Sequence, residues 1–193
     1  LSLLLSIILL IILILGLIIT PPSPQVQAAA AFDIASSATS TSGSDITSIS
    51  WTHDPVDATE GAVVVILSLK VAVTGLSVTY GGAAMTEVTG SPITNTVQVR
   101  AFYKTNSSAA AATVSASWTE SIKGAVGGAV SFTGVDQTTP VGTLVSTTGT
   151  ATSASVNATA GASDITVDGL ACNKVGAETG CGDVTAGGGQ TER

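Results

Sequence analysis

Residues Thr96 to Lys104 read TVQVRAFYK, and the character of the side chains alternates along this stretch. The residues of one parity are apolar or aromatic: Val97, Val99, Ala101 and Tyr103. The other parity holds the polar and charged residues and one phenylalanine: Gln98, Arg100, Phe102 and Lys104. Successive side chains of a β-strand point to opposite faces of a sheet. The stretch therefore predicts a strand with the first set toward a core and the second set toward solvent.

Similar runs lie on both sides of this stretch, separated by Gly, Pro, Asn and Asp at intervals of roughly 10 residues. Ala62–Leu69 (AVVVILSL) is apolar on both faces, which predicts a central strand. Gly81-Gly82 between Ser77–Tyr80 and Ala83–Val88 predicts a two-residue hairpin loop. Ala125–Phe132 (AVGGAVSF) is a strand of small residues that another element can approach closely.

The fold class follows from the whole set of runs. The remaining predicted strands are Ile46–His53, Thr113–Trp118, Leu144–Ser146, Ser153–Thr159 and Ile165–Leu170. No stripe of helical period accompanies them. We expect an all-β chain, an antiparallel β-sandwich (Ig-like or jelly-roll-like) of about nine strands, preceded by an N-terminal hydrophobic helix.

That helix is predicted by Leu1–Ile19, which is apolar except for Ser2, Ser6 and Gly16 and is followed by helix-breaking prolines. Small residues at 26, 28 and 30 fit a signal peptidase site. A cleaved secretory signal is our first interpretation; an uncleaved signal anchor and a retained assembly helix, as in pilin-like subunits, are the alternatives. The expected location is extracellular or at the cell surface, with membrane contact only through this segment if it is uncleaved.

The chain divides into three predicted parts. Residues 1–28 are the signal peptide or membrane anchor, and residues 29–44 are a Ser/Thr/Ala-rich linker. Residues 45–193 are the β-sandwich domain. The chain begins without Met or a basic segment and ends in the glycine-rich TAGGGQTER. We therefore expect both ends to be truncated, with a final strand missing.

Composition excludes some partners. Charged residues make up 10% of the chain, against about 25% in typical domains, and the net charge is −7. The six basic residues are dispersed. Nucleic acid and anionic lipid both require clustered Lys and Arg, so neither is an expected partner.

Few residues offer catalytic chemistry. His53 is the only histidine, and no G-x-S-x-G motif supplies a nucleophile for it, so a structural role at the end of its strand is expected. Glu87 and Glu120 are the carboxylates that a glycosidase would have to bring together. We expect no catalytic residue and a chain that is not an enzyme.

Two candidate ligand sites remain. Arg100 and Phe102 on the polar face of their strand form an Arg–Phe pair that could stack on a sugar or a partner protein, the alternative being packing under a loop. Asp54, Asp57 and Glu60 crowd one loop and could hold calcium, the one cofactor considered, although their spacing does not match an EF-hand. The alternative is a solvated strand connection.

Cys172 and Cys181 enclose eight residues rich in glycine and polar groups. In an exported protein such a pair predicts a disulfide, with free thiols as the alternative.

Several segments together resemble a family of uncharacterised secreted bacterial β-sandwich surface domains. They are Val78–Gly82 (VTYGG) with Met85-Thr86, Gly128–Pro140 (GAVSFTGVDQTTP), Val167–Leu170 (VDGL) and Gly187–Thr191 (GGGQT). The resemblance covers nearly all of the chain after Phe32. It implies the sandwich fold and export, and it implies no catalytic residue.

The sequence thus predicts an exported, non-catalytic structural or adhesion module of the cell surface or extracellular space, with a surface glycan or a protein as its partner. The alternative is a carbohydrate-binding module or an accessory domain of a secreted hydrolase.

Overall fold

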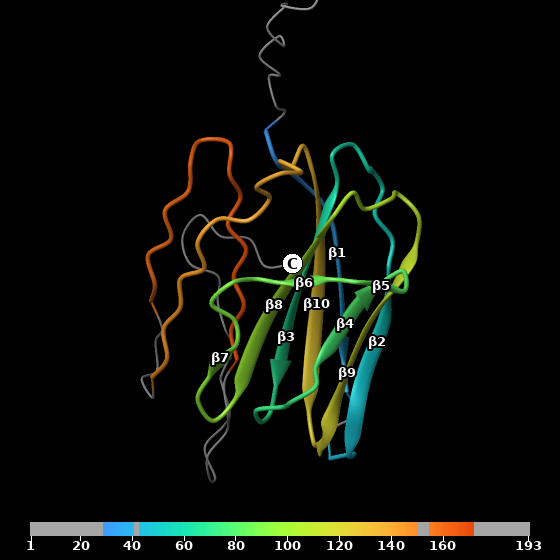
Figure 1. Ribbon diagram of the computed structural model, residues 1–193, viewed down its shortest axis with the longest axis vertical. Helices are drawn as coiled ribbons and strands as arrows, with labels where there is room; N and C mark the ends of the chain where they lie inside the picture. Colours follow the sequence, from blue (N-terminus) through green and yellow to red (C-terminus); the bar gives the residue numbers. More distant parts are fainter. Residues whose placement is uncertain (1–28, 41–42, 150–154, 172–193) are drawn as a thin grey trace, which may run out of the picture.

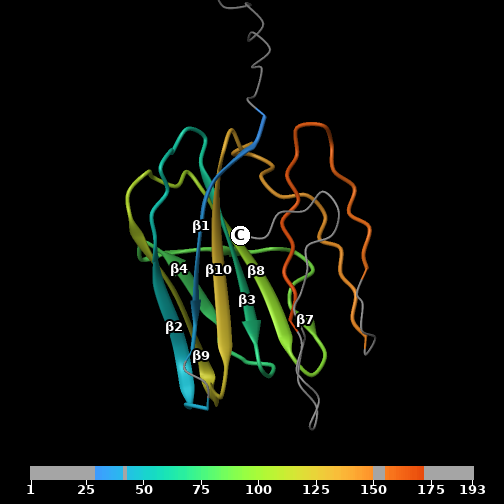
Figure 2. The same ribbon diagram turned by 180° about the vertical axis from the view of Figure 1, so that it is seen from behind.

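Two antiparallel β-sheets pack face to face in the computed structural model, which describes residues 29–40, 43–149 and 155–171. The β-sandwich predicted from the sequence is confirmed, and the described residues contain no helix. Figures 1 and 2 show the two layers from opposite sides. No helix in the described part of the chain is long and apolar enough to span a membrane. The predicted leader, residues 1–28, lies outside the described residues.

The larger sheet has the strand order β1-β10-β3-β8-β6, with β7 also paired to β8. Its strands are β1 (Ala31–Thr39), β10 (Ala125–Thr133), β3 (Ala62–Leu69), β8 (Gln98–Thr105), β6 (Thr86–Glu87) and β7 (Ile93–Thr94). The prediction that Ala62–Leu69 is a central strand is confirmed, because β10 and β8 flank β3 on its two sides.

The smaller sheet has the order β2-β9-β4-β5. Its strands are β2 (Ile46–His53), β9 (Ala112–Ile122), β4 (Ser77–Tyr80) and β5 (Ala83–Ala84). Tyr80 pairs with Ala83 across a two-residue loop, and Gly81 and Gly82 have φ angles of 59° and 78°. Positive φ at both central positions is what a type I′ hairpin requires, so the predicted hairpin is confirmed.

The core lies between the sheets. From the larger sheet, β3 contributes Val63, Val65 and Leu67, which are fully buried. From the smaller sheet, β9 contributes Val114 and Ala116, also fully buried. Alternation along each strand places these side chains on the inner face and leaves their neighbours facing outward.

The small-residue strand β10 allows the close approach that its sequence predicts. A Cβ atom added at Gly127 would lie 2.5 Å from Cη2 and 2.7 Å from Cζ3 of Trp51. The indole of Trp51 therefore sits directly on the backbone of β10, where any side chain would collide with it. A glycine on one sheet and a tryptophan on the other together set how the sheets meet at this point.

The predicted faces of the Thr96–Lys104 strand were wrong. Phe102 and Gln98 are buried at 4% exposure each, whereas Val99, Ala101 and Tyr103 are only half-buried. Register explains the reversal: Phe102 pairs with Val65 of β3, and residues directly opposite in an antiparallel pair share a face.

The segment predicted as a linker was also assigned wrongly. Residues 31–39 form β1, which pairs with β10 from Ala31↔Thr133 to Thr39↔Val126. Low-complexity Ser/Thr/Ala sequence has no strong propensity of its own, but the edge of β10 offers it backbone partners on both sides of a register shift between Phe32 and Ala35. Pairing with that edge, which no pattern within the segment indicates, makes it a strand.

The strands predicted after residue 140 are not formed in the described residues. Residues 144–146, 155–159 and 165–170 are extended without ladder pairing, and Val156 and Leu170 are exposed. This segment lies along the outer side of the larger sheet: a Cβ at Gly169 would meet Cγ2 of Ile66 at 2.5 Å. Figure 2 shows it beside β8 and β7. Apolar alternation is present, but the described residues of this segment pair with no strand edge.

Candidate functional site

The only histidine lies in a corner where β1 of one sheet runs beside β2 of the other. Trp51 Nε1 donates a hydrogen bond to Ser36 Oγ at 3.1 Å, and Ser36 Oγ lies 2.8 Å from His53 Nδ1. Ser36 belongs to β1, whereas Trp51 and His53 belong to β2. The three side chains therefore form a hydrogen-bonded link between the two sheets.

His53 is enclosed in this corner, with 1% of its surface exposed. Burial lowers the pKa of its imidazole below the ordinary value, although the negative charges of Asp33 and Asp54 act to raise it. Nε2 of His53 and the hydroxyl of Tyr80 are both buried without a hydrogen-bond partner among the described residues. The two rings meet edge to face at a centroid distance of 6.1 Å. Burial also raises the pKa of Tyr80.

Ser36, His53 and Asp33 are the residue types of a Ser-His-Asp hydrolase, but their arrangement differs from one. Asp33 Oδ2 accepts hydrogen bonds from Ser131 Oγ at 2.9 Å and from the backbone N–H of Val56 at 3.0 Å. A general base must reach the proton of a group that contacts substrate. With 1% of its surface exposed, His53 offers no such contact, and the trio stabilises the join between the sheets.

Arg100 and Phe102 do lie together, but not as an exposed pair. The Arg100 guanidinium is 5.8 Å from the centre of the Phe102 ring, and Phe102 belongs to the core cluster. Arg100 Nε donates to Glu87 Oε1 at 2.9 Å, and Nη2 bonds Oε2. The prediction of an exposed stacking surface at Phe102 is therefore wrong, because the ring is in the core and Glu87 takes the guanidinium.

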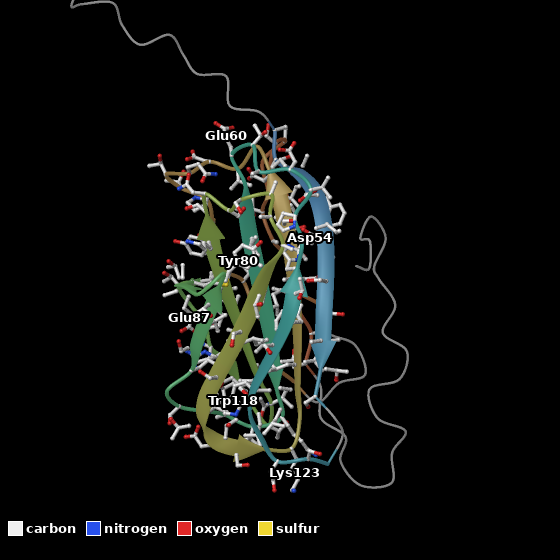
Figure 3. All side chains as sticks on the ribbon, turned by 90° about the vertical axis from the view of Figure 1, so that its right-hand side faces the viewer. Asp54, Glu60, Tyr80, Glu87, Trp118 and Lys123 are labelled. Atoms are coloured by element: carbon white, nitrogen blue, oxygen red, sulfur yellow. The ribbon has the colours of Figure 1, made fainter. Side chains whose placement is uncertain are left out.

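The two carboxylates considered for glycoside hydrolysis have separate partners in separate sheets. Glu87 in β6 is held by Arg100 and Ser91, and the hydrogen bond from Arg100 is the main reason that its pKa is lowered. Glu120 in β9 accepts hydrogen bonds from Thr74 N at 2.7 Å and Thr74 Oγ1 at 2.6 Å, which lower its pKa. Figure 3 shows Glu87 at the edge of the sandwich. Each carboxylate is engaged in local structure.

Asp54, Asp57 and Glu60 do not converge. Asp57 Oδ1 accepts hydrogen bonds from Thr59 N and Thr59 Oγ1, both at 2.8 Å, and these bonds lower its pKa. Among the described residues no group of three acidic, His or Cys side chains is placed to hold a metal ion. The three residues are therefore not brought together as a metal site in the described part of the chain, and Asp57 closes a turn of the strand connection. Figure 3 shows Glu60 at the top of the sandwich and Asp54 lower down, on its right-hand side.

Two other predicted features can be placed. Asp136 accepts hydrogen bonds from the N–H groups of Thr138 at 2.7 Å and Thr139 at 3.0 Å, the turn chemistry that an Asp before Thr-Thr-Pro favours. These bonds lower the pKa of Asp136. Cys172 and Cys181 lie outside the described residues, and their disulfide stays a prediction.

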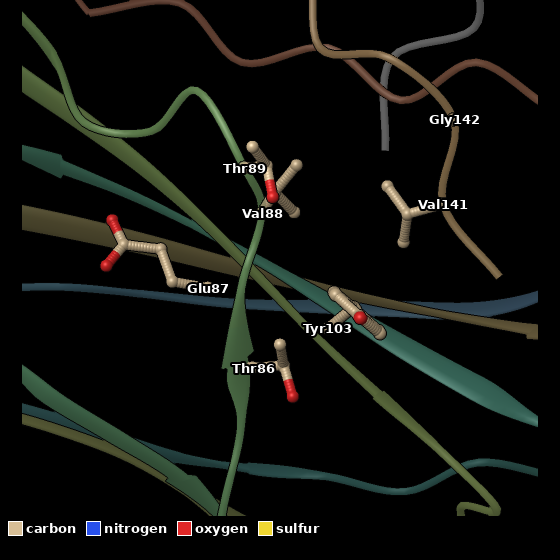
Figure 4. A pocket seen from close by; sticks show the side chains of 7 residues that line it. All are labelled: Thr86, Glu87, Val88, Thr89, Tyr103, Val141 and Gly142. Atoms are coloured by element: carbon tan, nitrogen blue, oxygen red, sulfur yellow. The ribbon is translucent and has the colours of Figure 1, made fainter. Parts of the chain in front are cut away.

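A shallow hollow opens on the outer side of the larger sheet. It has a volume of about 120 Å³ and is lined from β6, β8 and the following segment by Thr86, Glu87, Val88, Thr89, Tyr103, Val141 and Gly142. Figure 4 shows Glu87 pointing away from Tyr103 and Val141. Small-molecule sites typically enclose about 300–1,000 Å³. The hollow is therefore too small for a ligand of that size.

The outer face of the smaller sheet is a flat array of hydroxyl groups. Strand pairing aligns Ser48, Ser117 and Ser77 in one row and Ser50, Ser115 and Thr79 in the next, and then Thr52 with Thr113. No charged residue occurs in these rows, which we call the hydroxyl face. Neighbouring strands lie about 4.8 Å apart, and residues i and i+2 about 6.8 Å apart, so the hydroxyls repeat in two directions.

Sequence reasoning found part of this face and missed part of the corner. The alternation within Ile46–His53 puts Ser48, Ser50 and Thr52 on one face of that strand, but only the register shows that β9 and β4 continue the same rows. Ser36 was missed because it fell in a segment expected to be a linker.

Comparison with known proteins adds no relative: no family model matches the chain, and no curated protein or solved structure is significantly similar to it.

Proposed function

We propose that this chain is an exported, non-catalytic adhesion or structural module that contacts a neutral, hydroxyl-rich polymer through its hydroxyl face. The observation that carries the proposal is the in-register array of uncharged Ser and Thr on three paired strands. Each hydroxyl can donate one hydrogen bond and accept two, so such an array suits a partner that offers both donors and acceptors.

The charge distribution favours a neutral partner. The chain carries a net charge of −7, yet none of the hydroxyl-face rows contains a charged residue. A polyanion or a basic protein surface would call for complementary charges at the contact. A polysaccharide surface presents neutral hydroxyls and needs none.

Two further features support a role in binding over catalysis. Glu87 and Glu120, the carboxylates considered for hydrolysis, each have a local hydrogen-bond partner. The described hollow is small. Export is supported by the apolar run Leu1–Ile19 and by the resemblance to secreted bacterial surface domains.

The test is a pull-down of the domain with insoluble neutral polysaccharides, cellulose and chitin. We expect the wild-type protein to co-sediment, with little change on raising the salt from 0.15 M to 1 M, because screening acts on charges. Ser50→Glu, which places a charge in the middle of the hydroxyl face, should lower binding at least tenfold.

Ser37→Glu is the matched control, since Ser37 is also an exposed serine but lies on β1 of the other sheet. Binding that is equal in both variants, or absent from wild type with both polymers, would contradict the proposal. Sedimentation of the protein without polymer would indicate instead that the face contacts a second copy.

A further inference from the structure

His53 is a buried titratable group that the proposed function does not use. It links the two sheets through Ser36, whose Oγ lies 2.8 Å from His53 Nδ1. The strands it joins, β1 and β2, are the edge strands of their sheets, so no ladder hydrogen bonds connect them. Apart from the hydrogen bond from the backbone N–H of Val56 to Asp33, only side chains hold this corner closed.

Hydrogen-bonding capacity limits what this link can be. An indole N–H can only donate, so Ser36 Oγ accepts from Trp51. Ser36 Oγ can also donate its own proton to Nδ1 of the neutral His53 ring or accept a second hydrogen bond from it, depending on the tautomer. In either tautomer, Nε2 of His53 has no partner among the described residues.

Protonation of the ring would disturb this link. Both ring nitrogens would then carry a proton, so Ser36 Oγ would have to accept from Trp51 and from His53 Nδ1, with its own hydroxyl proton turned away from the ring. A positive charge would also be placed in a site with 1% exposure, with Nε2–H still unpartnered. An unpaired buried charge is strongly unfavourable.

The surrounding groups do not offset this effect. Asp33 on β1 and Asp54 after β2 favour the charged ring, and Tyr80 on β4 meets it edge to face. From β9, the residue opposite His53 is Ala112, which is not titratable. The net result of burial and these charges is a His53 pKa below the ordinary value of 6.5, with burial as the largest cause.

We propose that His53 is an acid-sensitive latch: the neutral ring holds β1 against β2, and protonation of the ring releases this corner of the sandwich. Release removes one attachment of β1 and leaves the other, its ladder with β10, so β1 should leave the edge of β10 more often and expose Trp51 as it does.

The sign of the pH effect follows from linkage. Because the unfolded chain binds a proton at His53 more readily than the folded chain, stability is complete above the ordinary pKa of 6.5 and falls as the pH drops below it. The unfolding equilibrium constant should rise as the pH is lowered from about 7 to 5, by at most tenfold per pH unit, the limit for one proton. The carboxylates with lowered pKa act only at lower pH.

The first experiment measures this dependence by urea unfolding of the wild type and of His53→Gln, which cannot titrate. The wild type should lose stability between about pH 7 and 5, and His53→Gln should show a flat profile there. An equal slope in both proteins would overturn the proposal. Since the chain has a single histidine, NMR titration of its ring in the wild type gives the same answer if the variant fails to fold. A ring pKa at or above 6.5 would also overturn it.

The second experiment locates the opening by amide exchange, expressed as protection factors. In the wild type, β1 should lose protection at about pH 5 while central β3 keeps it. Ser36→Ala breaks the link without a change of charge, so β1 should already be less protected at pH 7. Ser37→Ala, at the exposed neighbouring position, is the matched control and should behave as the wild type. Unchanged β1 protection in the wild type at pH 5 would overturn the proposal.

Discussion

At the scale of single residues, Gly127 determines how closely the two sheets meet. A Cβ there would lie 2.5 Å from the Trp51 indole and 3.1 Å from Leu67 Cδ2, and the rigid indole has nowhere to move without repacking. Gly127→Ala should therefore destabilise the fold by about 1–3 kcal/mol, the usual effect of overpacking. Gly128→Ala is the matched control, because nothing lies within 4 Å of a Cβ at Gly128. Denaturant unfolding of the two variants measures the difference, and equal midpoints would show that Trp51 does not require the glycine.

Glu87 is the second residue whose replacement should change stability, here in a way that depends on pH. Arg100 lowers its pKa in the folded state, so its contribution to stability is present above the ordinary value of 4.5 and is lost as the pH falls through the lowered pKa. Glu87→Gln should destabilise by about 1–2 kcal/mol near neutral pH, since a half-buried guanidinium loses its charged partner, and the deficit should shrink in acid. Asp45→Asn, which removes the exposed partner of Lys123, should change stability by less than about 0.5 kcal/mol. Urea unfolding at neutral and acid pH tests both; a deficit that is independent of pH would contradict the assignment.

At the scale of elements, the sequence predicted a strand well where the segment is itself patterned as a strand. It predicted a strand poorly where only hydrogen bonding to a neighbouring strand makes the segment extended. β3 could be placed at the centre because both of its faces are apolar. β1 could not be predicted, because its Ser/Thr/Ala sequence becomes a strand only against the edge of β10. Phe102 was assigned to solvent because parity within one strand does not say which set faces the core. The register between β8 and β3 identifies the set that faces the core, because it places Phe102 opposite Val65.

The extended segment after residue 140 provides an element-scale prediction. Its alternating apolar residues resemble those of a strand, but its backbone has no ladder partner in the described residues. Amides of residues 155–170 should therefore exchange quickly, while those of β3, bonded on both sides, are protected by orders of magnitude. Hydrogen-exchange mass spectrometry checks this directly. Protection of residues 165–170 comparable to that of β3 would mean that this segment is a true strand in solution.

At the scale of the whole molecule, the low charge and the Ser/Thr-rich exterior both follow from the β-sandwich, whose smaller sheet carries hydroxyls in place of charges on its outer face. Both sheets use their inner faces for a shared Val, Leu, Ala and Trp core, and the smaller sheet uses its outer face for the hydroxyl rows. The candidate sites chosen from sequence by residue type, the Arg–Phe pair and the acidic loop, are engaged in local structure. The hydroxyl face is visible only as an assembly of three strands.

The shared core also predicts that the two sheets unfold together. Leu67 is fully buried on β3 of the larger sheet, whereas both tryptophans, Trp51 and Trp118, lie on the smaller sheet. Leu67→Ala should destabilise the protein by about 2–5 kcal/mol through lost burial and a cavity. Because neither sheet has another core, tryptophan fluorescence and far-ultraviolet circular dichroism should report the same single transition at a lower denaturant concentration.

Val126→Ala, at a half-exposed position of β10, is the control. It should change the free energy of unfolding by no more than an ordinary surface substitution does, about 0.5 kcal/mol. If fluorescence kept its wild-type midpoint in Leu67→Ala while circular dichroism shifted, the sheets would be independent units, and the latch between β1 and β2 would have no shared core to act on.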